Sequence, residues 1–323
     1  MVLDFYGLRE PPFGTTPDPR FTYLGRSYRE ALASVCIGLQ FGHGLLAVVA
    51  SAGLGKTMLL FHVLEHVRRR SRTVFLFHTQ CDGHGLLRQI LRELGQPDEH
   101  DPIAMYGSLR RMLEEERRQG GNVVLVIDEA HNLDASALET IRLLSDFETA
   151  TEKLLQIVLA GQPPLAERLL EPGLASLKQR ISTIAHIGPL TETEALAYIE
   201  YRLSVAGATE PAVFDEDALR LVVRETGGVP REINNVLSNA LCLGCATRAR
   251  PIGRRAIVEV LRDRDFKPLC GLDARTVNAL NPSQPLPSVR ATEHTLQEPQ
   301  DLPTGVRRRS ANVRGSAFAR IGP

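Results

Sequence analysis

The 323-residue sequence has no net charge, because 38 lysines and arginines balance 38 aspartates and glutamates. Bulk charge therefore gives no reason to expect a nucleic acid or a membrane surface as partner, although it leaves room for local patches. No apolar run reaches the roughly 18 residues of a membrane-spanning helix. The start, Met1-Val2-Leu3-Asp4, lacks the basic and apolar stretches of a signal peptide. The five cysteines are an odd number without framework spacing, which favours a reducing compartment, so we expect a cytoplasmic protein.

Between residues 27 and 189, short apolar runs alternate with helical segments, the first of which starts with Ser27 as a plausible cap. Runs that are apolar on both faces and separated by helices indicate a parallel sheet covered on both sides. We predict an α/β core with five strands at Leu45–Val49, Thr73–Phe77, Val123–Ile127, Leu155–Leu159 and Thr183–Ile187.

The segments on either side of this core have other compositions. Residues 1–26 contain Pro11, Pro12, Pro17 and Pro19, which predict an irregular segment. Strand signals stop after Gly188-Pro189, and helical patterns over 190–268 predict an all-helical subdomain. Residues 269–323 are rich in proline, serine, threonine and arginine with few large apolar residues, so we expect a disordered tail.

The strongest chemical signal is the loop Ala50-Ser-Ala-Gly53-Leu-Gly55-Lys56-Thr57, which follows a predicted strand and opens a predicted helix. This context is that of a phosphate-binding P-loop, although Ala50 stands where the first glycine is usual. Backbone N–H groups of the loop and the helix N-terminus bind phosphates, and Lys56 reaches the β- and γ-phosphates. The Thr57 hydroxyl is the expected Mg²⁺ ligand. The predicted ATP-binding set is Ala50, Gly53, Leu54, Gly55, Lys56, Thr57 and Met58.

Two further strands end in polar residues. Val123–Ile127 is followed by Asp128, placed to hold Mg²⁺, and by Glu129, placed as general base if the chain bends to turn it toward the γ-phosphate. The alternative is a carboxylate that caps the next helix. Leu155–Leu159 leads to Gln162, which can orient the attacking water if this strand lies between the other two; a simple turn is the competing interpretation.

Two arginines suit phosphate oxygens, because a guanidinium stays charged and donates from a fork of N–H groups. Arg180 precedes the last strand and can act as an arginine finger on a neighbouring subunit's nucleotide. Arg231 begins a helix of the helical subdomain and can bend over the phosphates. For both, a solvated surface residue is the alternative.

The opening, Phe5-Tyr-Gly-Leu-Arg-Glu-Pro-Pro-Phe13 and Pro17-Asp-Pro-Arg-Phe-Thr-Tyr-Leu24, resembles that of the ExeA/GspA-type AAA+ ATPases of bacterial secretion systems. Over about residues 3–265 the chain is also similar to this family in Asp128-Glu-Ala-His131, Leu159-Ala-Gly-Gln-Pro163, Gln179-Arg-Ile181 and Gly228-Val-Pro-Arg-Glu-Ile-Asn234. The resemblance implies a P-loop AAA+ core with a helical lid, assembled as a ring or filament. It implies Walker A residues Lys56 and Thr57, Walker B residues Asp128 and Glu129, Gln162 as sensor 1, Arg180 as finger and Arg231 as sensor 2. It also implies that the proline-rich opening, residues 1–26, borders the nucleotide site, with Phe13 as a contact of the adenine.

Members of that family carry a transmembrane helix and a periplasmic region after the ATPase, whereas this sequence continues into its proline- and arginine-containing tail, so we expect a soluble version. The core also resembles transposition regulators of the TniB/TnsC/MuB type, which assemble on DNA. The expected function is an oligomeric ATPase switch that binds ATP and Mg²⁺. Its partner is a secretion or envelope protein or, alternatively, DNA and a transposase. A nucleotide-sensing scaffold with negligible turnover is a third hypothesis.

Overall fold

The structure is a computed structural model that describes residues 2–14, 16, 18–68, 71–77, 81–208 and 212–262. All of them belong to one compact unit. The predicted tail, 269–323, and Pro17 of the opening lie outside the described residues. Among the described helices, none combines the length and the apolarity that crossing a bilayer requires.

The five predicted strands are confirmed, and they form one parallel sheet in the order β2-β3-β4-β1-β5. The register aligns Leu45 of β1 with Ile157 of β4, and Leu46 of β1 with Thr183 of β5. The strands are β1 (Leu45–Ala50), β2 (Arg72–Leu76), β3 (Val123–Ile127), β4 (Leu155–Gly161) and β5 (Thr183–Ile187).

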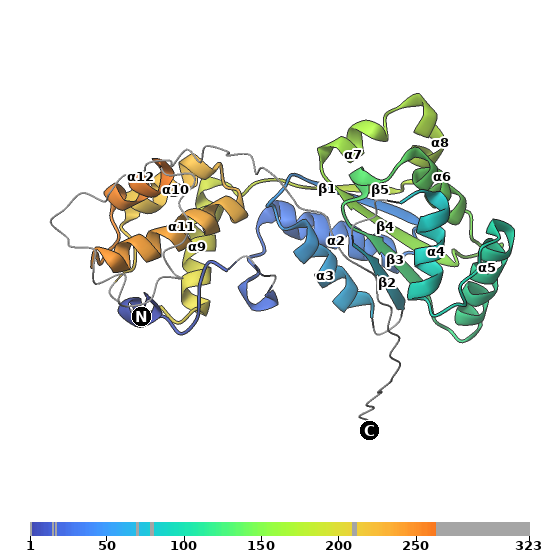
Figure 1. Cartoon of the computed structure of the whole chain (residues 1–323), viewed down its shortest axis with the longest axis horizontal. Helices are drawn as coiled ribbons and strands as arrows, with labels where there is room; N and C mark the ends of the chain where they lie inside the picture. Colours follow the sequence, from blue (N-terminus) through green and yellow to red (C-terminus); the bar gives the residue numbers. More distant parts are fainter. Residues whose placement is uncertain are drawn as a thin grey trace, which may run out of the picture. The chain divides into compact units, whose positions relative to one another are not determined.

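Helices cover both faces of the sheet, as the doubly apolar strands predict (Figure 1). Successive residues of a strand point to opposite faces, so Val124 packs with one helical layer and Leu125 with the other. One layer contains α2 (Arg26–Gln40) and α3 (Lys56–Val67). The other contains α4 (Gly83–Glu93), α5 (Pro102–Arg118), α6 (Ala135–Leu144), α7 (Pro163–Arg168) and α8 (Ala175–Arg180).

The helical part has its own apolar core. It consists of α9 (Glu192–Val205), α10 (Glu216–Thr226), α11 (Pro230–Ala246) and α12 (Arg254–Arg262), joined by part of the N-terminal segment. Thr191 and Glu194 form a reciprocal capping box at the start of α9, which accounts for the abrupt change from strand to helix there.

The N-terminal segment is more ordered than its prolines suggest. It starts with a short helix, α1 (Val2–Tyr6), and contains a 3-10 turn, η1 (Pro19–Phe21). Helix α1 precedes the first proline, and Pro19 occupies the first position of η1, where its missing N–H costs nothing. The prediction of an irregular segment is therefore wrong at these two places.

Two predicted details are also wrong. Phe13 does not line the cavity described below; it is buried in the helical core, with its ring 6.2 Å from that of Phe214. Ser27 does not cap α2, because the helix begins one residue earlier with Gly25 at the cap position. Instead, the Ser27 hydroxyl donates to the Gly188 carbonyl at 3.2 Å and accepts from the Gly188 N–H at 3.3 Å.

Candidate active site

The loop between β1 and α3 has the backbone that its glycines predict. Gly53 and Gly55 have φ of +82° and +91°, a region that residues with a Cβ rarely adopt. Gly55 is the cap position of α3 and, having no side chain, makes no side-chain cap hydrogen bond to the first turn of this helix. The N–H groups of that turn and the positive end of the helix dipole are therefore available to an anion.

Residues from the loop and from the end of β3 meet directly below the first turn of α3. The Thr57 hydroxyl donates to Asp128 Oδ2 at 2.8 Å, and Lys56 Nζ lies 2.9 Å from Glu129 Oε1. Lys56 Nζ is also 3.9 Å from Asp128 Oδ1, and both of these side chains are buried. The two signals, whose contacting residues are 71 and 73 positions apart in the sequence, thus converge on one point.

The adjacent hydroxyl and carboxylate oxygens of Thr57 and Asp128 fit Mg²⁺. This ion takes one or two protein oxygens and keeps water or phosphate oxygens as its other ligands. A hydroxyl and a carboxylate only 2.8 Å apart are such a pair, at the end of a loop built to bind phosphates.

Glu129 turns toward this point because its backbone is left-handed, with φ of +51°. For a residue with a Cβ this conformation costs about 1 kcal/mol, and its own N–H donates to Asp128 Oδ1 at 2.8 Å. Burial raises the pKa of Glu129, but the hydrogen bond and charge of Lys56 outweigh it, with help from Gln162 and His131. The pKa of Glu129 is therefore below its ordinary value, and the group is ionised at neutral pH.

Gln162 is brought beside Glu129 by the strand order. Because β4 lies between β3 and β1, its end faces the same point, and Gln162 Nε2 is 3.3 Å from Glu129 Oε2. His131 belongs to this group too: its Nδ1 is 3.3 Å from Glu129 Oε2 and 3.3 Å from the backbone nitrogen of Gln162, and its Nε2 is 3.2 Å from Gln162 Nε2. Sequence reasoning assigned no role to His131. Its position two residues after the carboxylate, in a tight turn, was the available signal.

The two arginines have different surroundings. Arg231, at the start of α11, donates its backbone N–H to the Gly53 carbonyl at 3.3 Å and lines the same cavity as the P-loop. Arg180 ends α8, does not line this cavity, and forms an ion pair with Asp146. The structure therefore brings Arg231 to the P-loop of its own chain and leaves Arg180 away from it.

A cavity of about 250 Å³ adjoins the P-loop. The predicted residues in its wall are Gly53, Leu54, Gly55, Lys56, Thr57, Met58, Glu129, Gln162 and Arg231, while Ala50 and Asp128 are buried behind them. The opening segment, which the sequence places at the border of the site, also lines the cavity, but the sequence did not single out Thr22 or Tyr28, nor Tyr198, Arg202 and Asn234 of the helical part. No spacing could have found these residues, because more than 160 positions separate the two groups.

The wall that the N-terminal segment provides is fixed by buried polar contacts. Arg202 donates to the carbonyls of Pro12 at 2.5 Å and Gly14 at 3.1 Å. Tyr198 donates to Asn234 Oδ1 at 2.7 Å. Thr22 also lines the cavity, and its hydroxyl oxygen is buried without a hydrogen-bond partner in the described protein.

Several known proteins are similar to this chain in sequence or in fold. Residues 39–169 match the AAA domain family. The chain is 35% identical to General secretion pathway protein A of Aeromonas hydrophila over 254 residues, which are 78% of this chain and 46% of that protein. The chain thus spans about half the length of this relative.

Two solved structures share the fold at low identity. The ORC2 protein of Aeropyrum pernix, in ADPNP and ADP complexes, has a TM-score of 0.60 and 16% identity over 79% of this chain and 71% of that one. A Drosophila ORC structure bound to DNA also has a TM-score of 0.60, with 17% identity over 79% and 65% of the two chains.

Proposed function

Because this chain is a P-loop protein of the AAA+ fold related to General secretion pathway protein A, we propose that it binds Mg·ATP beside Lys56 and hydrolyses it as an oligomeric switch. The observation that carries this proposal is the convergence of Lys56, Thr57, Asp128 and Glu129 at the end of one phosphate-binding loop. Transition-state charge in phosphoryl transfer is stabilised by such a lysine and metal pair.

Lys56 links phosphate binding to the general base. Its ammonium group is paired with Glu129 at 2.9 Å, and phosphate oxygens at the loop compete for the same group. When Lys56 bonds the phosphates, the Glu129 carboxylate is released to accept a proton from water. Gln162, 3.3 Å from that carboxylate, donates a hydrogen bond that keeps water and base aligned. Thr57 and Asp128 would hold Mg²⁺, which would supply neutralisation of the phosphate charge.

Two arginines complete the proposed site. Arg231 reports the presence of the γ-phosphate to the helical part, since its helix also contacts Gly53 of the loop. Arg180 serves the nucleotide of a neighbouring copy in a ring or filament, which couples turnover to assembly. The four residues that we assign to catalysis are Glu129, Lys56, Gln162 and Arg180.

Two variants separate binding from turnover. Lys56→Ala removes the ammonium group from the loop and is expected to weaken ATP binding by about 100-fold or more. Glu129→Gln keeps the shape of the site and is expected to bind ATP normally, while kcat falls by about 100-fold or more. Equilibrium binding of a fluorescent ATP analogue and phosphate release measure the two effects.

A matched control is Glu114→Gln, which removes an exposed carboxylate on α5 and should change neither quantity. Equal ATP affinity in Lys56→Ala and in the wild type would contradict the proposed P-loop. Undiminished turnover in Glu129→Gln would contradict the proposed base.

The pathway in which the switch acts has two candidates. The relation to General secretion pathway protein A supports a switch that acts from the cytoplasm on a partner protein of a secretion or envelope system. The second candidate is a DNA-associated regulator of transposition, suggested by the resemblance of the core to TniB/TnsC/MuB-type regulators; a structure of the same fold is bound to DNA. ATPase activity measured with and without duplex DNA across a salt series distinguishes them, because stimulation that falls steeply with salt indicates phosphate contacts.

A further inference from the structure

Arg180 lies near the end of the sheet where the strands begin, and the P-loop lies at the end where they finish. The N–H of Ser182 donates to the carbonyl of Leu45 at 3.0 Å, which places Arg180 near the start of β1. The P-loop follows the other end of this strand, after Ala50. Five steps of a parallel strand span roughly 16 Å, so Arg180 is remote from the phosphate loop of its own chain.

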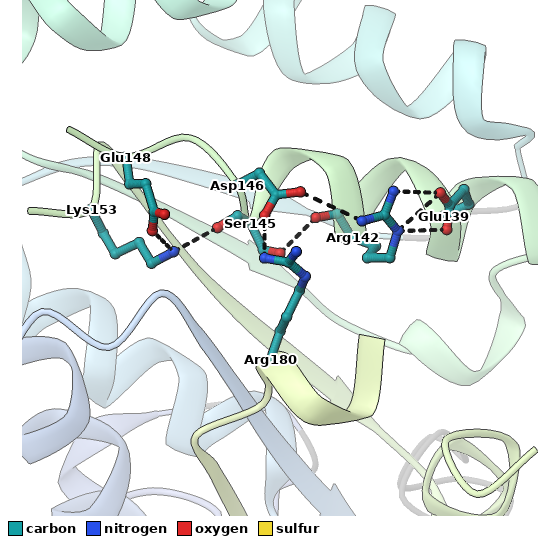
Figure 2. Close-up of polar contacts among 7 residues, drawn as sticks. All are labelled: Glu139, Arg142, Ser145, Asp146, Glu148, Lys153 and Arg180. Atoms are coloured by element: carbon teal, nitrogen blue, oxygen red, sulfur yellow. Dashed lines mark hydrogen bonds and ion pairs between the residues drawn. The ribbon is translucent and has the colours of Figure 1, made fainter. Parts of the chain in front are cut away.

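The guanidinium of Arg180 is held by the carboxylate of Asp146, as Figure 2 shows. Asp146 Oδ1 contacts Arg180 Nη1, and Asp146 Oδ2 is 3.5 Å from Arg142 Nη1. Arg142 in turn bonds both oxygens of Glu139, through Nε at 2.9 Å and Nη2 at 2.8 Å. The four side chains form a row of alternating charge in which each oxygen of Asp146 has its own cation.

The backbone under Asp146 is fixed as well. The N–H of Asp146 donates to the Leu143 carbonyl at 3.1 Å, and the buried Ser145 hydroxyl donates to the Arg142 carbonyl at 2.6 Å. Lys153 Nζ donates to the Ser145 carbonyl at 3.0 Å and pairs with Glu148 (Figure 2). Asp146 therefore projects from the fixed end of α6.

Resting on the proposed composite site, we propose that Asp146 is a positioning residue that holds Arg180 ready for the nucleotide site of a second copy of this chain. Arg180 contacts Asp146 through Nη1, and a guanidinium has three nitrogens that donate hydrogen bonds. The remaining N–H groups suit phosphate oxygens, and the side chain, 35% exposed, is accessible to a neighbour. Because Asp146 restricts the rotamers of Arg180 beforehand, less conformational freedom is lost on insertion.

Mixed assemblies of two full-length variants test this role. Arg180→Ala keeps its own site but lacks the finger, so it is the acceptor. Glu129→Gln keeps the finger but lacks the base, so it is the donor. Each variant alone should have little activity, and their mixture should regain it. Asp146→Asn placed in the donor should lower the regained kcat about threefold to fivefold, the upper range for an exposed ion pair. The KM for ATP should not change.

The same Asp146→Asn change in the acceptor serves as the folding control, because the acceptor's finger is already absent; activity there should stay within about twofold. Glu148→Gln in the donor is the charge control. It removes a carboxylate that also interacts electrostatically with Arg180 but pairs with Lys153. It should leave kcat unchanged, because Lys153 keeps its own bond to the Ser145 carbonyl.

The outcomes separate the two proposals. A mixture that regains no activity refutes the composite site, and the positioning role with it. Regained activity that Asp146→Asn in the donor leaves unchanged refutes the positioning role alone. Equal loss in donor and acceptor indicates a structural role, and a gain in the donor indicates an inhibitory contact; either result overturns the inference.

Discussion

The buried guanidinium of Arg202 on α9 fixes the N-terminal wall of the cavity, and its removal should loosen that wall. Arg202 is 8% exposed and donates three hydrogen bonds, to the carbonyls of Pro12 and Gly14 and, at 3.0 Å, to the Tyr198 hydroxyl. Its guanidinium carbon also lies 4.9 Å from the centre of the Phe21 ring. The perturbation is Arg202→Ala, with Arg202→Lys as the conservative partner.

The size of the effect follows from these contacts. Hydrogen bonds from a charged donor are worth about 1.5–3 kcal/mol each, but carbonyls that lose the donor regain water, so the sum is not additive. The contact with the aromatic ring adds about 0.5–2 kcal/mol. We expect Arg202→Ala to lower the free energy of unfolding by about 3 kcal/mol. Arg202→Lys should lower it by about half as much, because an ammonium group cannot reproduce the fork.

Urea unfolding measures the stability, and steady-state kinetics measure the site. The KM for ATP should rise while kcat changes little, since Arg202 does not contact the residues proposed for catalysis. Arg20→Ala is the matched control. Arg20 lies in the same segment but is 61% exposed, and solvent screening should make its pairs with Asp18 and Glu10 contribute little to stability. A loss below about 1 kcal/mol for Arg202→Ala, or an unchanged KM, would refute the reasoning.

Three further changes have definite expected outcomes. Gly228→Ala should lower the free energy of unfolding by about 2–4 kcal/mol, because Gly228 has φ of +72° and its new Cβ would lie 2.0 Å from the Leu190 carbonyl oxygen; thermal melting measures this. Phe13→Leu should destabilise the helical core by about 1 kcal/mol, yet leave the KM for ATP unchanged, since Phe13 does not line the cavity. Lys56→Ala should raise the pKa of Glu129, because burial raises this pKa and the hydrogen bond and charge of Lys56, which lower it, are then absent. NMR titration of the carboxyl group detects the change.

The controls for these changes are also available in the chain. Gly227→Ala has a comparable φ of +57° but meets nothing within 4 Å, so it should cost only about 1 kcal/mol. Equal melting temperatures for Gly227→Ala and Gly228→Ala would contradict the steric argument. A raised KM in Phe13→Leu would return this residue to the nucleotide site.

The pH dependence that follows from Glu129 has a defined sign. Its pKa in the folded chain lies below the ordinary value of 4.5, so its ion pair with Lys56 contributes stability that is fully present above about pH 4.5. This contribution is lost as the pH falls through the lower, folded pKa. In Lys56→Ala that loss should disappear from the acid unfolding curve, and an unchanged curve would show that the pair does not stabilise the folded state.

The sequence by itself determined the elements and the local geometry of the phosphate loop. Five short apolar runs sufficed to predict the strands, because burial on both faces leaves no polar alternation. Gly53 and Gly55 permit the positive φ angles that the phosphate loop adopts. Asp128 and Glu129 directly follow the last residue of β3 in the sequence, so their place at the strand end can be predicted. These are properties of neighbouring residues, so they can be read without the rest of the chain.

Only the tertiary structure decided which distant residues meet. Because all five strands are apolar, their pattern does not encode the order that places β4 between β3 and β1 and sets Gln162 against Glu129. The sequence could not predict the partner of Arg180 either, because its contact with Asp146 depends on how α6 packs against α8. Phe13 shows the converse: an aromatic residue that the resemblance places beside the adenine is buried in the helical core instead. Local patterns fix backbone conformation, whereas side-chain neighbours depend on packing between elements that are far apart in the chain.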